Sequence, residues 1–122
     1  MTLTIELSLP DRALSPNARK CWRAVAAAKK AARANAKMHA LAALGRRAAP
    51  RWERATWRAT FYWPDARRRD DDNAAASCKA YRDGIADAGI VVNDNGFITF
   101  PAVFMVDRQR PRVVIEIEEY RE

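Results

Sequence analysis

The sequence predicts a small α/β protein, a single domain with a mixed β-sheet and two main helices. Its 122 residues match the usual size of one domain, so residues 1–122 are treated as one unit. Several short stretches alternate apolar and polar residues, as half-buried strands do. Two longer stretches with capping residues and a closing glycine indicate helices. The expected order is strand, helix, strand, helix, strand, strand, with the helices layered on the sheet.

Alternating apolar and polar residues place two strands in the first half of the chain. Residues 2–9 carry an apolar side chain at every second position. The same alternation runs through residues 52–63, where Trp57 and Phe61 share one face. Pro64 should end or bulge this second strand. Both strands are therefore expected to be half buried.

Between these strands, an alanine-rich segment containing many lysines and arginines predicts a long helix over residues 18–44. Ser15 is expected to cap this helix and Gly45 to end it, with Ala34–Asn35 as a candidate break. Large apolar residues are few, so the helix should pack thinly and expose a basic surface. Trp22 is assigned to the core in preference to a base-stacking role, because tryptophan buries well.

The second half of the chain predicts one helix followed by short strands. Asp72 stands where a helix N-cap belongs, and Gly89 follows the last helical residues. The elements expected from this pattern are a helix over residues 73–88, a short strand over 90–92, a turn over 93–96, a strand over 97–107 with an edge or bulge at Pro101, and a final strand over 113–118.

Charge is distributed unevenly along this chain, whose net charge is +7. From Arg12 to Arg69 there are sixteen lysines and arginines and two acids, whereas from Asp70 onward there are six and eleven. A basic half predicts a polyanionic partner such as nucleic acid, and the alternative is a solvated helix face. The candidate phosphate-binding residues are Arg19, Lys20, Arg23, Lys29, Lys30, Arg67, Arg68 and Arg69, with Arg33 and Lys37 in the same helix.

Other classes of protein receive little support from the composition. No run approaches the roughly 18 apolar residues of a membrane span, so no membrane partner is expected. The first residues do not form a signal-peptide pattern, and Cys21 and Cys78 are too few and too far apart for a disulfide framework or a zinc site. These features indicate reduced thiols in a cytoplasmic protein. His39 is the only histidine, and no nucleophile triad or P-loop is present.

The acidic run that follows Arg67–Arg69 is the candidate metal site. If the chain is extended there, Asp70 and Asp72 point the same way, with Cα atoms roughly 6.5–7 Å apart. Two carboxylates at that spacing can share Mg²⁺, which prefers oxygen ligands, while Asp71 would point away. The alternative is that Asp72 is an ordinary helix cap and the arginines neutralise the acids.

Two further residues could complete this site. Lys79 follows Asp72 by seven residues, about two helical turns, so its amine can reach toward whatever the aspartates bind. The alternative is an i,i+4 ion pair with Asp83 on the helix surface. Asp94 follows a short apolar segment that could bring it beside the start of the helix, although its surroundings also have ordinary turn chemistry.

The run Arg67–Asn73, followed by Lys79–Gly84, Asp87–Gly89 and Asp94, resembles the RusA family of Holliday junction resolvases. The spacing of Asp-x-Asp-Asn, lysine, Ala-Gly and aspartate carries this resemblance. The segment Leu14–Arg19 is also similar to phage-type members, and the likeness extends from about Leu7 to Asp107.

The resemblance implies a RusA-like fold and a homodimeric, Mg²⁺-dependent endonuclease. Such an enzyme resolves four-way DNA junctions by paired symmetric nicks, in recombination and repair, in a bacterial or phage-infected cell. Asp70, Asp72 and Asp94 would be the metal ligands, and Lys79 the catalytic lysine. Asn93 departs from the pattern, because the family often has an acid there. The alternatives are a non-catalytic basic nucleic-acid-binding protein and a nuclease for other branched DNA.

Overall fold

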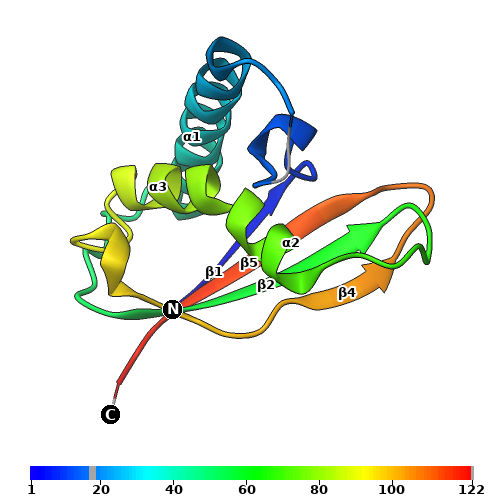
Figure 1. Cartoon of the computed structure of the whole chain (residues 1–122). Coiled ribbons are helices and arrows are strands. Elements are labelled where there is room, and N and C mark those ends of the chain that lie inside the picture. Colours follow the sequence, from blue (N-terminus) through cyan, green and yellow to red (C-terminus); the bar gives the residue numbers. More distant parts are fainter. Residues whose placement is uncertain (17–18, 122) are drawn as a thin grey trace.

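The structure, a computed structural model, describes residues 1–16 and 19–121 and confirms the small α/β class with a mixed sheet (Figure 1). The elements in chain order are β1 (Thr2–Leu7), η1 (Arg12–Leu14), α1 (Trp22–Leu44), β2 (Ala55–Trp63), α2 (Asp71–Ser77), α3 (Lys79–Asp87), η2 (Asp94–Gly96), β3 (Phe97–Thr99), β4 (Val103–Val106) and β5 (Arg112–Glu119).

The sheet has the order β1-β5-β2-β3, and β4 also pairs with β2. Strand β5 is antiparallel to both β1 and β2, whereas β3 and β4 run parallel to β2. The single strand predicted over residues 97–107 is therefore two short strands that follow β2 one after the other. Pro101 lies between them, and a proline has no backbone N–H to donate to the ladder.

Helices α1, α2 and α3 cover one face of the sheet (Figure 1). The core lies between these two layers. It contains the alternate apolar side chains that the strand patterns predicted, so the predicted faces of β1 and β2 are confirmed, and β5 buries alternate residues in the same way. These buried residues are Leu3, Ile5 and Leu7 of β1, Ala55, Trp57, Ala59 and Phe61 of β2, and Val113, Ile115 and Ile117 of β5.

Helix α1 differs from its prediction at one end. It begins at Trp22, and Ser15 instead ends the short helix η1, so the predicted Ser15 cap is wrong. Residues 17–18, where the helix was expected to begin, lie outside the described residues. The helix then runs unbroken through Ala34–Asn35 and ends at Gly45, whose φ of 61° is a conformation that glycine adopts readily.

The buried residues of α1 begin at Ala32. Its buried residues Ala32, Ala36, Ala40 and Leu44 recur every four residues and form one stripe. The first turns project away from the rest of the molecule, as Figure 1 shows. The Trp22 side chain is 73% exposed, so its assignment to the core is wrong. Among residues 1–16 and 19–121, nothing covers most of this ring.

The predicted helix over residues 73–88 is divided into α2 and α3 by Cys78. Gly89 follows α3 with a positive φ of 86°, as expected for a helix end. The predicted strand over residues 90–92 is only an isolated parallel bridge between Val91 and Trp52, and the turn after it is the single-turn helix η2. Within the described residues, no helix has the length and apolar character needed to span a membrane.

Candidate active site

Asp70 begins the acidic run and caps α2. Its backbone is extended, and its Oδ1 accepts hydrogen bonds from the backbone N–H groups of Asp72 (2.8 Å) and Asn73 (3.1 Å). The cap is therefore Asp70, and the prediction of Asp72 as the cap is wrong. Asp71 and Asp72 belong to the first helical turn, where the helix dipole favours acids. The extended spacing assumed for Asp70 and Asp72 does not apply, because Asp72 is helical.

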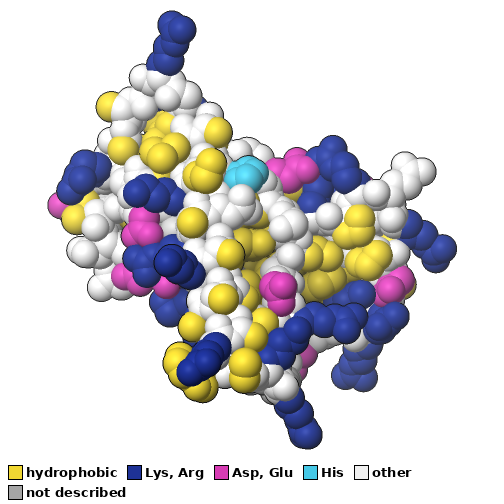
Figure 2. Space-filling view, turned by 90° about the horizontal axis from the view of Figure 1, so that it is seen from above, with side chains coloured by type: hydrophobic (Ala, Val, Ile, Leu, Met, Phe, Trp, Pro, Cys, Tyr) yellow, Lys and Arg dark blue, Asp and Glu magenta, His cyan; other side chains and the backbone are white. Residues whose placement is uncertain are grey.

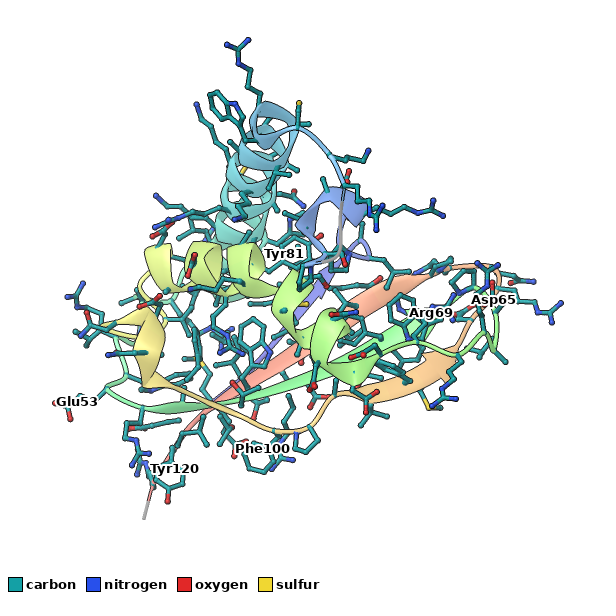
Figure 3. The ribbon with its side chains drawn as sticks, in the orientation of Figure 1. Glu53, Asp65, Arg69, Tyr81, Phe100 and Tyr120 are labelled. Atoms are coloured by element: carbon teal, nitrogen blue, oxygen red, sulfur yellow. The ribbon has the colours of Figure 1, made fainter. Side chains whose placement is uncertain are left out.

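The three arginines before this run have different surroundings. The guanidinium of Arg69 donates to the Asp65 carboxylate (2.9 Å; Figure 3) and to the backbone carbonyls of Asp65 and Arg67. It also lies over the Trp63 ring, 4.4 Å from the ring centre. The Arg67 N–H and then the Arg69 side chain lower the pKa of Asp65. Arg69 thus braces the loop, whereas Arg67 and Arg68 are exposed and remain candidates for phosphate contact.

Lys79, the first residue of α3, has two acidic neighbours. Its Nζ lies 3.2 Å from Asp83 Oδ1, one turn along the helix, and 3.7 Å from Asp94 Oδ2. The predicted i,i+4 pair with Asp83 is confirmed. The phase argument that placed Lys79 on the Asp72 face assumed one continuous helix, and the division at Cys78 removes that assumption.

The segment before Asp94, residues 90–92, is hydrogen-bonded to the loop that precedes β2. The backbone N–H of Trp52 donates to Ile90, and that of Val92 donates to the Trp52 carbonyl. These bonds place η2 beside α3, so Asp94 reaches Lys79 although the two residues are distant in sequence. Asp83 and Asp94 also line one shallow depression on this side of the molecule. The short apolar segment was expected to bring Asp94 beside Asp72 at the start of the predicted helix; it brings Asp94 to Lys79 at the start of α3 instead.

The predicted metal ligands lie in two places. Asp70 and Asp72 line a shallow depression with Arg68 and Arg69, and Asp94 lines the one beside α3. Across residues 1–16 and 19–121, no group of three or more His, Cys, Asp or Glu side chains is arranged to hold a metal ion. The donor chemistry of Asp70 and Asp72 nevertheless fits Mg²⁺, which commonly takes one or two carboxylates together with substrate phosphates and water. The three-carboxylate set stays a prediction.

The sequence did not predict that Arg33 forms an ion pair with Asp87. Arg33 was grouped with the phosphate-binding residues, but its guanidinium donates two hydrogen bonds to Asp87, from Nε (2.6 Å) and Nη2 (2.8 Å). This hydrogen bonding raises the pKa of Arg33 and lowers that of Asp87. The pair joins α1 to α3 and so helps to position Lys79. The one sequence signal for this contact is Gly84, because a glycine inside a helical pattern often marks close packing against a neighbouring element.

The helical side of the molecule carries most of the predicted DNA-binding residues. Figure 2 shows Lys and Arg side chains projecting around this face, with apolar side chains between them. Strong positive charge at a surface attracts phosphate backbones without reading base sequence. The exposed basic residues between Arg19 and Lys37 are Arg19, Lys20, Arg23, Lys29, Lys30, Arg33 and Lys37, and Arg33 alone among them is ion-paired within the described residues.

The fold and this site define a small α/β protein with a basic helical face and clustered aspartates beside a lysine. No protein-family model matches the chain. It is 37% identical over 120 residues to an uncharacterized protein of Xylella fastidiosa (strain Temecula1 / ATCC 700964), an alignment that covers 93% of this chain and 74% of that protein. The chain belongs to the same family as this Xylella protein. The relative's name states no activity, so the resemblance to RusA resolvases stays a prediction.

Proposed function

We propose that this protein is a RusA-like, Mg²⁺-dependent endodeoxyribonuclease that cuts branched DNA, with the four-way junction as its principal substrate. One observation carries the proposal: the ammonium of Lys79 lies within 4 Å of two carboxylates, those of Asp83 and Asp94, on a basic face of the molecule. The motif that carries the resemblance contributes Asp70, Asp72, Lys79 and Asp94, and the fold brings two of these four into contact.

In the proposed mechanism, Asp70, Asp72 and Asp94, which line two separate depressions, would hold one or two Mg²⁺ ions. Such an ion would supply Lewis-acid polarisation of the scissile phosphate and lower the pKa of the attacking water. Lys79 would place its positive charge where negative charge develops on the phosphoryl oxygens. The exposed lysines and arginines of α1, with Arg67 and Arg68, would hold the phosphate backbones of the arms. Arg69 would act indirectly, through the loop that it braces.

Paired symmetric nicks require two active sites, so we propose a homodimer. Strand β4 lies at the edge of the sheet, and its Val103, Met105 and Val106 side chains are each about half exposed. An apolar edge strand is a surface that a second copy can cover. Sedimentation velocity at micromolar protein should give a dimer, and a monomer that still makes paired cuts would contradict this part of the proposal.

A second candidate function is supported by the same geometry. The carboxylate of Asp70 already serves as a helix cap, and Lys79 already pairs with Asp83, so structural roles account for both residues. The protein would then be a basic nucleic-acid-binding protein that does not cut DNA.

The deciding experiment compares a mobile four-way junction with a linear duplex of the same sequence, with and without Mg²⁺. Cleavage of the junction that requires Mg²⁺ supports the nuclease, whereas tight binding without cleavage supports the binding protein. A flap and a three-way junction added to the same assay would show whether other branched DNA is preferred.

A further inference from the structure

A cavity of about 760 Å³ lies between the first half of α1, the end of η1 and the helices α2 and α3. Its volume falls within the range of sites that hold small ligands or parts of larger ones. Part of its wall is apolar, formed by residues such as Leu14, Val25 and Ala76. The charged residues on its wall are Lys29, Lys30, Arg33, Lys79 and Asp83.

Two of these cations have no ion-pair partner among the described residues. Arg33 is paired with Asp87, and Lys79 with Asp83. Among residues 1–16 and 19–121, neither Lys29 nor Lys30 forms an ion pair, and both are exposed. The cavity therefore combines an apolar wall with an excess of positive charge, which suits an occupant that is both anionic and partly apolar.

An exposed aromatic ring continues this surface outward. Trp22 precedes Lys29 by seven residues, so it lies on the same face of α1, two turns nearer the projecting end. Its side chain is 73% exposed, and the Arg23 guanidinium lies 5.3 Å from the ring centre. An exposed tryptophan beside cationic residues offers a flat surface on which a nucleobase can stack.

We propose that this surface, from Trp22 through the cavity to Lys79, binds a strand of the DNA substrate whose bases become unpaired at the branch point. Sites for single-stranded DNA combine a basic groove with aromatic stacking residues, and both are present here. A duplex keeps its bases stacked inside, so it would bind across the whole basic face, with Lys29 and Lys30 as two contacts among many, and would use neither the ring nor the apolar wall. The inference rests on the proposed nuclease function, because it identifies the part of the substrate that is led to Lys79.

The test measures binding by fluorescence anisotropy without Mg²⁺, so that cutting plays no part. The probes are labelled oligothymidylate and a duplex of equal length. Lys29→Ala/Lys30→Ala should weaken oligothymidylate binding by about tenfold or more and duplex binding by about threefold or less. The matched control Lys37→Ala/Arg46→Ala removes two exposed cations outside the cavity and should weaken both probes to the same extent. Equal losses of both probes in the Lys29/Lys30 variant would overturn the inference.

Substitutions at Trp22 provide a second, independent test in the same binding assay. Trp22→Leu should weaken oligothymidylate binding by about tenfold, in the range for losing one stacked base, while Trp22→Phe should retain most of the affinity. Ala76→Leu, which fills part of the cavity without changing the charge, should also weaken this probe more than the duplex. Unchanged oligothymidylate binding in Trp22→Leu and Ala76→Leu would show that the surface does not hold an unpaired strand.

Junction cleavage in Mg²⁺, measured separately, distinguishes the two proposals. If the wild type cuts no branched DNA but the variants selectively lose single-strand binding, the surface from Trp22 to Lys79 binds an unpaired strand and the proposed nuclease function is wrong. If the wild type cuts junctions and the variants bind oligothymidylate normally, the nuclease function is supported and the proposed single-strand-binding surface is wrong.

Discussion

Gly84 in α3 lies so close to Arg33 in α1 that a Cβ atom added at Gly84 would stand 2.1 Å from the Arg33 carbonyl oxygen. The Arg33 side chain reaches the same helix and is hydrogen-bonded to Asp87. The absent side chain and the ion pair together fix α3 against α1. They therefore set the position of Lys79 relative to the basic face.

Gly84→Ala tests this contact, because alanine should raise the free energy of unfolding in an open helix and lower it where the two helices touch. In an open helix, replacing glycine with alanine stabilises the fold by up to about 1 kcal/mol. Here the new methyl group would meet backbone atoms, so we expect a loss of about 1–3 kcal/mol in the free energy of unfolding. Urea denaturation measures the change. A variant as stable as the wild type, or more so, would contradict the close approach of the two helices.

Substitutions at Asp70 can separate its cap from its proposed metal role. Asparagine keeps a side-chain oxygen that can cap the helix, whereas alanine removes it at a cost of about 1 kcal/mol. Asp70→Asn should therefore retain stability and lose junction cleavage, and Asp70→Ala should lose both. Single-turnover cleavage and urea denaturation provide the two measurements.

The neighbouring acids supply the matched comparison for Asp70. Asp72→Asn should also abolish cleavage, while Asp71→Asn, which removes the same charge one residue away, should cut at close to the wild-type rate. All of these variants should still bind the junction. Normal cutting by both Asp70→Asn and Asp72→Asn would end the metal-ligand assignment.

Lys79→Ala should lower the single-turnover rate at saturating Mg²⁺ by about a hundredfold, in the range for losing one preorganised electrostatic contact. Junction binding should be nearly unchanged. Asp83→Asn is the control, because it breaks the same ion pair and leaves the ammonium in place. If Lys79 serves only that pair, both variants should cut normally and each should lose about 0.2–0.5 kcal/mol of stability.

Acid should destabilise the protein through the carboxylates with lowered pKa values. The hydrogen bond from Arg33 lowers the pKa of Asp87 below its ordinary value of 3.8, so the folded state holds the charged form more strongly than the unfolded chain does. That stability is present above the unfolded pKa and is lost as pH falls through the folded pKa. Thermal unfolding should show a Tm that falls in this acidic range, and Asp87→Asn should reduce the fall. An unchanged acid profile in Asp87→Asn would show that the pair contributes no pH dependence.

The sequence by itself determined the features that depend on local periodicity. Leu3, Ile5 and Phe61 were placed on buried strand faces correctly, because successive side chains of a strand point to opposite faces of the sheet. Gly45 ended α1 as expected, since its conformation is a local requirement. The Lys79–Asp83 pair followed from helical spacing alone.

The tertiary structure decided the features that depend on contacts between distant elements. Trp22 is exposed because α1 projects beyond the layers that could bury it. Cys78 divides the second helix although it is no helix breaker; the residue is buried, and α2 and α3 meet there. The pairing of Trp52 with Val91 brings Asp94 to Lys79, and helix packing pairs Arg33 with Asp87. Such contacts join residues far apart in sequence, so they follow from how the layers fit together and no local pattern encodes them.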